Sequence, residues 1–403
     1  MKVYFGFNDI RQDGMGTEAM ALMRALKNEG IEVQPIHAWK AIYVPNYIEE
    51  FNPIFVSQSE EEPSISDNIK EMVNILNDIP KNSVFSHFGS PNWACVIPYL
   101  RSDIRVVVSV HSITPSALKI ATAYKERVSR FVAISWEVEK KLKKVLPPNI
   151  HHKISFITNA LNAEDYPEKD YNKSNDPLKV VFFGRIEDIT KGCDKIPAIA
   201  QKLKLRDINL EWHLYGYFHW GYENRFYELN KKYDVEDVVK YKGLLQPQEI
   251  PAILREYDIM IMPSNHEGCP MALIEAMLVG LPCVVSYIHD VTNMMLKPNE
   301  EGILCKKTDI KAFANAIRKL ALDKELRIRI GKAAHKKAVS EFSTEIQVTK
   351  YIKTFNEAIN SNDYNLIEIK QDLDKYIVPD LTKPHILARI LPTWFKRILK
   401  KYI

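Results

Sequence analysis

Cysteine is sparse in this chain, and its spacing excludes the residue's usual structural roles. The 403 residues contain five cysteines, and no two form a Cys-x-x-Cys pair: Cys95, Cys193, Cys269, Cys283 and Cys305. Disulfide frameworks and structural zinc sites are recognised by close, regular cysteine spacing. Neither is expected here.

Long apolar runs are also missing. No stretch reaches the roughly 18 uncharged apolar residues that a membrane-spanning helix needs. The chain starts "MKVYFGFND", a strand-like segment followed by polar residues, which is not the pattern of a signal peptide. The formal net charge is only +4, too small to indicate nucleic-acid binding. We therefore expect a cytoplasmic protein.

What the chain does contain is enough apolar sequence for two cores. Its length predicts two domains of about 150–200 residues each. Apolar, β-branched runs alternate with helical patterns, which is typical of a parallel sheet covered on both faces. The expected strands are 2–7, 32–36, 84–88, 105–110, 131–135 and 153–157, then 179–184, 210–216, 239–243, 258–264, 282–286 and 302–305. The fold class is therefore α/β, with two doubly wound, Rossmann-like sheets.

A polar stretch separates the two sets of strands. Residues 162–179 contain two prolines and no hydrophobic period, so we interpret them as a linker. The expected domains are 1–165 and 175–345, followed by a helical tail over 346–403. Ligands of doubly wound sheets bind at the carboxyl ends of the strands. The two domains are expected to face each other, with the site in the cleft between them.

The stretch "NHEGCPMALIEAMLVGLP", residues 265–282, places two glutamates around the start of a helix. Glu267 lies on the expected loop, Pro270 suits the first helical position, and Glu275 lies more than one turn inside the helix. A loop residue and a second-turn residue would contact different parts of one extended ligand. The backbone amides of Cys269, Met271 and Ala272 would point at the same place, and the positive end of the helix dipole suits a phosphate. The alternative is a surface loop with a solvated glutamate.

A second candidate site follows the strand in "VVFFGRIEDITKGCD". The strand ends at Gly184, Arg185 comes next, and Lys191 follows six residues later. Cations at a strand end are frequent partners of a diphosphate: arginine as a planar fork, lysine as a mobile point charge. Solvated charges beside a strand are the alternative.

Two weaker signals lie in the first domain. Gly14 and Gly16 open a helix in "NDIRQDGMGTEAM", where a backbone without side chains can approach an anion or an acceptor. A third glycine at the dinucleotide-binding spacing is missing. His111 ends the strand "RVVVSVH", where it could bind a sugar hydroxyl or a phosphate, or simply cap the strand; His87 has a similar position with weaker support.

Together, "GRIEDITKGCD", "PSNHEGCPMALIEAM" and "GLPCVV" resemble the retaining glycosyltransferases of the GT-B fold, family GT4. The glutamate pair with seven intervening residues resembles the E-x7-E motif of that family. Further likeness in "GMGTEAMALMRALKNEGIEV", "FVAISWEVEKKL", "ITNALNAEDY", "LYG" and "YKGLL" extends the resemblance over roughly residues 1–345.

The resemblance implies a role for each matching residue. Arg185 and Lys191 would hold the donor diphosphate, next to Gly184, and stabilise the leaving nucleotide. Glu267 would contact the donor sugar, assisted by the backbone groups of Gly268 and of the next three residues, up to Met271. Glu275 would hold the ribose hydroxyls.

The remaining matches lie further from the diphosphate. Gly243 and Leu244 would pass near the base, Gly16 would approach the phosphates or the acceptor, and His111 would stand near the reacting sugar. The donor would be a UDP- or GDP-sugar that serves as substrate, with no cofactor.

The chain departs from the family pattern at three points. Asp13 precedes Gly14 where the family often has Gly-Gly, so the loop is expected to suit another acceptor. Residues 216–226 read "GYFHWGYENRF" where many members have Gly-x-Gly-Pro, so the local donor contacts are expected to differ from those of the family. No Asp-x-Asp lies at a strand end, so a metal-independent enzyme is expected, with Arg185 and Lys191 supplying the positive charge.

The last residues combine an apolar stripe with positive charge. Residues 383–403 read "KPHILARILPTWFKRILKKYI", with apolar pairs every four residues and six lysines and arginines. That pattern is typical of a helix lying on an anionic membrane surface. The stripe could instead pack on the first domain or pair subunits. The first interpretation places the protein on the inner face of the cell membrane.

The sequence thus predicts a retaining glycosyltransferase (EC 2.4 type) that acts on a cell-surface glycan, a glycolipid or a similar acceptor in polysaccharide biosynthesis. The alternatives are a sugar-nucleotide epimerase or phosphorylase of the same fold, and a non-catalytic subunit that binds a glycan or stabilises a partner. The oligomeric state and the identities of donor and acceptor are not predicted.

Overall fold

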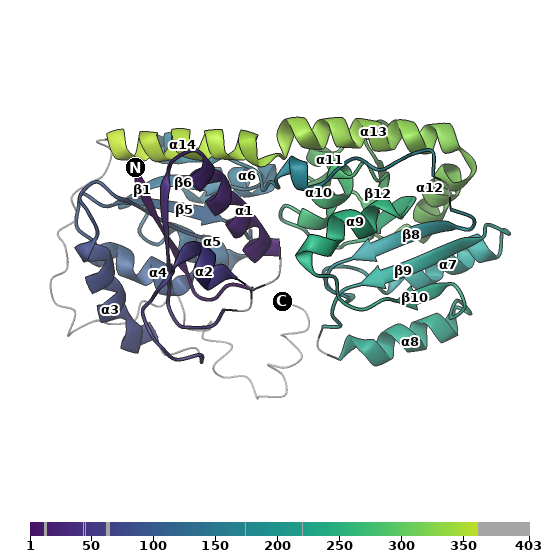
Figure 1. Cartoon of the computed structure of the whole chain (residues 1–403), viewed down its shortest axis with the longest axis horizontal. Coiled ribbons are helices and arrows are strands. Elements are labelled where there is room, and N and C mark those ends of the chain that lie inside the picture. The colour runs from purple at the N-terminus through teal and green to yellow at the C-terminus, as the bar shows by residue number, and fades with distance from the viewer. Residues whose placement is uncertain are drawn as a thin grey trace. The chain divides into compact units, whose positions relative to one another are not determined.

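The computed structural model describes residues 1–11, 14–42, 44, 46–61, 65–173, 175–219 and 221–361 (Figure 1). The predicted amphipathic segment 383–403 and Asp13 lie outside these residues. The chain divides into two compact units: unit 1 holds Met1–Asn159 together with the chain from Gln347 onward, and unit 2 is Ala160–Ile346.

Unit 1 is built on a seven-stranded parallel sheet with the strand order β3-β2-β1-β4-β5-β6-β7. Its strands are β1 (Lys2–Phe7), β2 (Glu32–His37), β3 (Ile54–Phe55), β4 (Val84–His87), β5 (Arg105–Val110), β6 (Val128–Ala133) and β7 (Ile154–Phe156). The helices are α1 (Gly14–Asn28), α2 (Tyr47–Phe51), α3 (Ile65–Asp78), α4 (Pro91–Val96), α5 (Pro115–Thr122) and α6 (Trp136–Val145), with short 3₁₀ turns η1 (Ile97–Tyr99) and η2 (Pro148–Lys153).

Unit 2 is built on a six-stranded parallel sheet with the order β10-β9-β8-β11-β12-β13. Its strands are β8 (Leu178–Phe183), β9 (Leu210–Tyr215), β10 (Val239–Tyr241), β11 (Ile259–Met262), β12 (Cys283–Ser286) and β13 (Ile303–Cys305). The helical elements are η3 (Ala163–Asp165), α7 (Lys195–Lys204), α8 (Tyr222–Lys232), η4 (Pro247–Glu249), α9 (Ile250–Arg255), α10 (Met271–Leu278), α11 (Thr292–Met295), α12 (Ile310–Leu322) and α13 (Lys324–Glu341).

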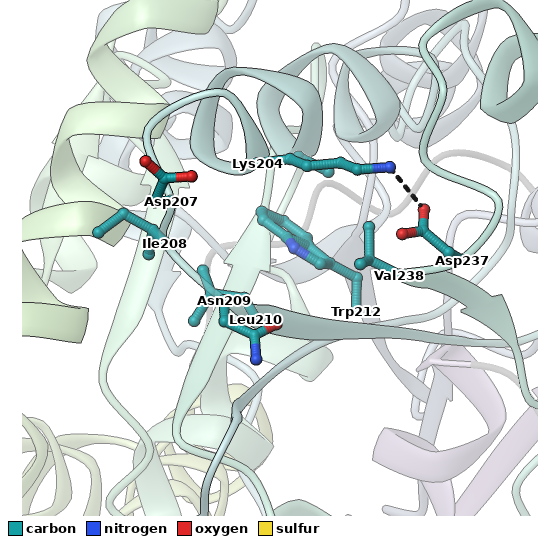
Figure 2. Close-up of a pocket in the computed structure, with 9 residues that line it drawn as sticks. Lys204, Asp207, Ile208, Asn209, Leu210, Trp212, Asp237 and Val238 are labelled. Atoms are coloured by element: carbon teal, nitrogen blue, oxygen red, sulfur yellow. Dashed lines mark hydrogen bonds and ion pairs between the residues drawn. The ribbon is translucent and has the colours of Figure 1, made fainter.

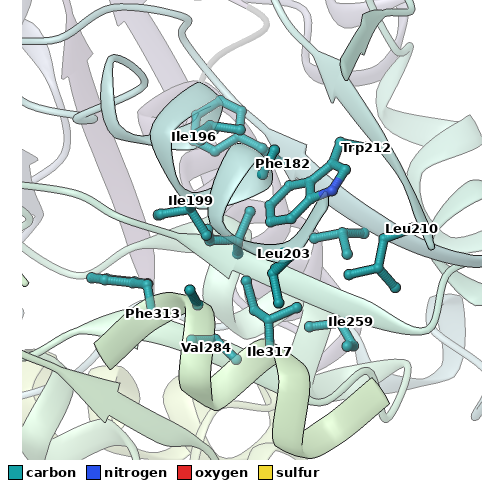
Figure 3. Close-up of a cluster of buried hydrophobic side chains, with 14 of the residues drawn as sticks. Phe182, Ile196, Ile199, Leu203, Leu210, Trp212, Ile259, Val284, Phe313 and Ile317 are labelled. Atoms are coloured by element: carbon teal, nitrogen blue, oxygen red, sulfur yellow. The ribbon is translucent and has the colours of Figure 1, made fainter. Parts of the chain in front are cut away.

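The apolar runs form strands because helices cover both faces of each sheet. Every residue of β5 is buried, as the continuous "RVVVSV" run predicts. In unit 2, Phe182 and Trp212 of the sheet pack with Ile199 of α7 and Ile317 of α12 in one apolar cluster (Figure 3). The two doubly wound sheets that the sequence predicts are therefore confirmed.

The last described helix, α14 (Thr344–Asn360), packs on the sheet of unit 1 (Figure 1). Its Phe355 lies 6.5 Å from Phe5 of β1, measured between ring centroids. Two arginines of the sheet bind its carboxyl end: Arg105 Nε donates to the carbonyl of Ile359 at 3.4 Å, and an Arg130 amino group donates to that of Glu357 at 3.2 Å. Helix α14 is thus fixed to the first sheet.

The predicted strand bounds need small corrections. The strand expected at 258–264 ends at Met262, because Pro263 has no N–H to continue the ladder. The first helix begins at Gly14, so both glycines lie in its first turn. The two-residue strand β3 was not predicted, since so short a segment carries no period.

Candidate functional site

Two loops of unit 2 leave its sheet at neighbouring strand ends. β8 and β11 are adjacent although two strands separate them in sequence, so the strand order reverses between them. In doubly wound sheets a ligand binds in the crevice at this point. Arg185 and Lys191 lie on the loop after β8, and Glu267 lies on the loop after β11. The topology brings together residues that are about 80 positions apart in sequence.

The two loops bind each other through Asn265. Its side-chain amide donates to the carbonyls of Asp188, at 2.9 Å, and Ile189, at 3.1 Å. Its backbone amide donates to the carbonyl of Thr190 at 2.7 Å. A Cβ added to Gly192 would meet the Pro263 carbonyl oxygen at 2.4 Å, so this close approach requires glycine. The loops therefore form one rigid structure.

A buried carboxylate, Glu187, holds the first loop in shape. It accepts hydrogen bonds from the backbone amides of Thr190, at 3.0 Å, and Lys191, at 3.1 Å, and its nearest contact with the Arg185 guanidinium is 3.7 Å. Burial alone raises the pKa of Glu187, but a hydrogen bond from the Thr190 hydroxyl, the two backbone hydrogen bonds and the nearby arginine outweigh it, so the pKa lies below its ordinary value. The ionised group thus fixes the backbone from which Lys191 projects.

Lys191 and Glu267 form the central ion pair of the site. The lysine Nζ lies 2.8 Å from Glu267 Oε1 and 2.9 Å from Oε2, and Ser264 Oγ donates to Oε1 at 2.6 Å. The glutamate side chain is 7% exposed and the lysine side chain 25%. A carboxylate has about four acceptor positions. Three are occupied here, so Glu267 keeps room for a ligand hydroxyl.

Arg185 is the second cation and is only partly used. One amino group donates to Thr190 Oγ1 at 3.1 Å, and 36% of the side chain is exposed. Its Nε is buried and has no hydrogen-bond partner among the described residues. A guanidinium with unused donors at a strand end suits an anion that accepts two hydrogen bonds.

Helix α10 starts beside this pair. Its first helical residue is Met271, and Pro270 is the N-cap with extended backbone (φ −71°, ψ 109°) rather than the first helical residue, which corrects the prediction. Pro270 instead supplies the carbonyl that accepts the first bonds, from Leu273 and Ile274. Gly268, Cys269 and Ala272 are half-buried, whereas Met271 is buried. The helix ends before Gly280, as predicted.

Glu275 lies in the second turn of α10 and is 5% exposed. The Tyr166 hydroxyl donates to its Oε1 at 3.1 Å. Burial raises the pKa of Glu275 to about 7, and the hydrogen bond from Tyr166 opposes this shift. The two glutamates therefore have separate surroundings, as expected for groups that contact different parts of a ligand.

Gly243 and Leu244 follow β10 on the far side of β9 from Arg185. The backbone amide of Gly216, just after β9, donates to the Gly243 carbonyl at 2.9 Å. Leu244 is 61% exposed. An exposed apolar residue thus lies at the same strand-end edge as the cations, two strands away from β8. Gly184 ends β8 directly before Arg185, as predicted.

The predicted residues of unit 1 lie at the carboxyl edge of its own sheet. A Cβ on Gly16 would meet the Arg11 carbonyl oxygen at 1.9 Å, so only glycine fits there. His111 follows β5; its Nε2 is buried without a hydrogen-bond partner among the described residues, and burial lowers its pKa to about 4. His87 is fully buried, with its pKa lowered to about 3 by burial.

A pocket in unit 2 lies elsewhere. It has a volume of about 310 Å³ and is lined by Lys204 at the end of α7, by Leu210 and Trp212 at the start of β9, and by Val238 just before β10 (Figure 2). Lys204 Nζ binds Asp237 at 3.0 Å across its rim. Because it opens at the amino ends of the strands, this pocket is not part of the site around Lys191 and Glu267.

Four residues that shape the site were not predicted: Tyr166, Glu187, Ser264 and Asn265. Three of them stand inside the stretches that drew attention, but a buried glutamate and a solvated one look alike in sequence. Tyr166 lies in the segment interpreted as linker, more than 100 positions from its partner, and no local spacing connects them.

Within the described ranges, no group of three or more His, Cys, Asp or Glu side chains is placed to hold a metal ion. Metal independence stays a prediction. The helices of the described part of the chain are all too short or too polar to cross a membrane.

Comparison with known proteins agrees with this geometry. Residues 165–337 match the family model "Glycosyl transferases group 1". The chain is 28% identical over 177 residues to the putative colanic acid biosynthesis glycosyltransferase WcaL of Escherichia coli K12, covering 42% of this chain and 43% of that protein. It is 38% identical over 102 residues to the UDP-Gal:α-D-GlcNAc-diphosphoundecaprenol α-1,3-galactosyltransferase of Escherichia coli, covering 25% and 26% of the two chains. These matches span less than half of each curated relative.

The crystal structure of Anabaena HepE in complex with UDP has a TM-score of 0.72 to this chain at 15% identity, over 88% of this chain and 100% of that one. At that identity the likeness concerns the fold. Two Rossmann-like units, each with its parallel sheet, confirm the α/β fold class of GT-B type that the sequence predicts. Residues 165–337 of this protein are therefore similar to the glycosyl transferases group 1.

Proposed function

We propose that this protein is a retaining glycosyltransferase that moves a sugar from a nucleotide-sugar donor to a hydroxyl of a cell-surface glycan, a glycolipid or a similar acceptor. The observation that carries the proposal is the Lys191–Glu267 pair, held beside Arg185 and the first turn of α10. It places two cations, one carboxylate and a helix N-terminus around one point.

The cations suit the donor diphosphate. Arg185 keeps unused donors, and Lys191 is a mobile cation on a rigid loop. The first amides of α10 and its dipole add further positive potential. Each charge-assisted hydrogen bond contributes about 1.5–3 kcal/mol. Because these side chains can carry the charge of the leaving diphosphate, the proposed reaction is metal-independent.

The carboxylates suit the two ends of the donor. Glu267 has an acceptor position left for a hydroxyl of the transferred sugar, while Lys191 holds the carboxylate in place. Glu275, in the second turn of α10, is assigned to the ribose hydroxyls. Leu244 and Gly243 are assigned to the base.

In the proposed reaction the acceptor oxygen forms a bond to the anomeric carbon on the face from which the nucleotide departs. The bond from that carbon to the diphosphate oxygen breaks, and the nucleoside diphosphate keeps the electron pair. The acceptor proton passes to a phosphate oxygen of the leaving group. Arg185, Lys191 and the α10 amides stabilise the negative charge that develops there.

The relatives narrow the choice of substrate. One is named as a UDP-galactose-dependent enzyme with a diphosphoundecaprenol-linked acceptor, and a structural neighbour binds UDP. We therefore propose a UDP-sugar donor first and a GDP-sugar second, with a glycan or lipid-linked acceptor. Gly16 and His111, at the strand ends of unit 1, are assigned to the acceptor and the reacting sugar.

The test is a screen of UDP- and GDP-sugars for protection against thermal unfolding, repeated on Arg185→Ala and Glu275→Ala. One donor should raise the melting temperature of the native protein, and both substitutions should abolish the effect. A protein that responds to no nucleotide sugar is instead a glycan-binding or partner-stabilising subunit. A protein that changes the bound sugar nucleotide without an acceptor is an epimerase.

We also propose that residues 383–403 bind an anionic membrane surface and place the enzyme on the inner face of the cell membrane. The segment follows α14, which is fixed to unit 1 by Arg105 and Arg130. Deleting 383–403 should abolish co-sedimentation with vesicles rich in phosphatidylglycerol. Unchanged vesicle binding by the shortened protein would contradict this assignment.

A further inference from the structure

The strongest unexplained feature near the site is a buried phenol on a buried carboxylate. Tyr166, directly after η3, is 6% exposed, and its hydroxyl donates to Glu275 Oε1 at 3.1 Å. In the described part of the chain, Tyr166 is the sole hydrogen-bond donor to this carboxyl group. The partner of Glu275 thus comes from the segment that enters unit 2, not from the sheet or from α10.

A glutamate side chain turns about three bonds, so one that must meet a ligand needs a fixed orientation. Groups that bind ligands act best when their rotamers are held by packing and by a supporting hydrogen bond. Tyr166 supplies that bond to Oε1 and leaves Oε2 without a hydrogen bond from the described residues. Buried tyrosine hydroxyls need a partner themselves, so the contact satisfies both groups.

We propose that Tyr166 is a positioning residue: it holds the carboxyl group of Glu275 so that the group's other oxygen accepts the ribose hydroxyls of the donor. This inference rests on the proposed function, because it assigns Glu275 to the ribose. It adds a residue of the entering segment to the donor site.

The same segment offers a matched control. The Tyr171 hydroxyl donates to the backbone carbonyl of Gly280 at 3.0 Å, just beyond the end of α10. Both tyrosines therefore connect the residues after η3 to the helix that carries Glu275. Tyr166 binds the carboxyl group, whereas Tyr171 binds a backbone carbonyl. Removing either hydroxyl costs one hydrogen bond, buried for Tyr166 and part-buried for Tyr171, and only the first of these bonds touches Glu275.

The protonation of Glu275 gives a readout that a structural role would not move. Burial raises its pKa to about 7, and the Tyr166 hydrogen bond lowers it. Removing that bond must raise the pKa further, so the ionised form appears at higher pH. Titratable groups on the elements packed against α10 include Arg255 on α9, Cys283 on β12, and Arg327 and His335 on α13, with Asp165 preceding Tyr166. None of them is a hydrogen-bond partner of the Glu275 carboxyl group among the described residues.

The experiment compares the full-length protein with Tyr166→Phe and Tyr171→Phe. Binding of UDP and GDP is measured by calorimetry from pH 5.5 to 8.5, and the donor KM and kcat are measured at pH 7. Tyr166→Phe should weaken binding and raise the donor KM about tenfold with little change in kcat, the effect of one hydrogen bond to a charged group. Its midpoint for the loss of binding on acidification should move to higher pH. Tyr171→Phe should keep the native KM and midpoint, although both variants lose some thermal stability.

Two results would overturn the inference. In the first, the wild-type protein binds nucleotide, and Tyr166→Phe has the same nucleotide affinity and the same pH midpoint. That result would leave the proposed function intact. The other is an equal change in both variants, which would assign the effect to general loosening of the segment. A wild-type protein that binds neither nucleotide overturns the proposed function and this inference together.

Discussion

The two units share one architecture and differ in how they treat charge at the carboxyl ends of their strands. In unit 2, Arg185, Glu187, Lys191 and Glu267 are held within two interlocked loops, and each charge has a partner. In unit 1, the strands end in His37, His87 and His111, whose pKa values are all lowered by burial.

The comparison teaches that a doubly wound sheet prescribes where a ligand binds and leaves the chemistry to the loops. Unit 2 has fixed cations and a helix N-terminus at the switch point of its sheet, which suits an anion. Unit 1 has one partly exposed imidazole, His111, and a glycine that allows a close backbone approach, which suits an uncharged hydroxyl. The difference agrees with the proposed division between a donor diphosphate and an acceptor.

The largest expected effect is the loss of a cation in unit 2. Lys191→Ala should lower kcat/KM by about 10²–10³, since it removes the charge proposed to stabilise the transition state and leaves buried Glu267 without its partner. Steady-state kinetics with the identified donor measures this. Lys204→Ala is the control, because that amine pairs with Asp237 at the other end of the strands. Equal losses of kcat/KM in Lys191→Ala and Lys204→Ala would contradict the special role given to the charges at the carboxyl ends of the strands.

A smaller effect is expected from the buried carboxyl group of unit 1. Glu18 of α1 is fully buried, accepts a hydrogen bond from Gln347 at 3.2 Å, and burial raises its pKa to about 8. Between its unfolded pKa, near 4.5, and about 8, the folded state binds the proton and the unfolded state does not. Stability therefore falls as pH rises through this window.

Glu18→Gln removes that dependence. The variant should be more stable than the native protein at pH 8 by roughly 2–4 kcal/mol and about equally stable at pH 4.5. Urea unfolding at several pH values measures this difference. A gain that is the same at both pH values would show that Glu18 does not titrate in this window, and that unit 1 tolerates a buried charge as unit 2 does.

The smallest effect is expected at His111. Its pKa of about 4 keeps the imidazole neutral above pH 5, so it acts as a hydrogen-bonding group and not as a cation. His111→Asn should lower kcat about tenfold, the worth of one hydrogen bond, and leave nucleotide affinity unchanged. His151→Asn, on η2 in the same unit, serves as control. Weakened nucleotide binding by His111→Asn would contradict the proposed division between a donor diphosphate bound by unit 2 and an acceptor bound by unit 1.

Most strands of the fold were predicted from the sequence with nearly correct bounds. The runs "KVYFGF" and "RVVVSV" coincide with β1 and β5, because a strand buried on both faces is apolar at most of its positions. The placement of Arg185 and Glu267 at strand ends followed in the same way. The pairing of Lys191 with Glu267 did not, since it depends on which strands are neighbours in the sheet.

The sequence by itself thus determined the two parallel sheets, the helix that starts near Met271, and the residue types available at the strand ends. Periodicity and local stop signals are properties of neighbouring residues, so they can be read along the chain. Tertiary structure decided the contacts between distant segments: Glu187 buried under its loop, Tyr166 on Glu275, and α14 returning to unit 1. A side chain's partner and its burial depend on packing, and packing alone turns an ordinary tyrosine or glutamate into part of a site.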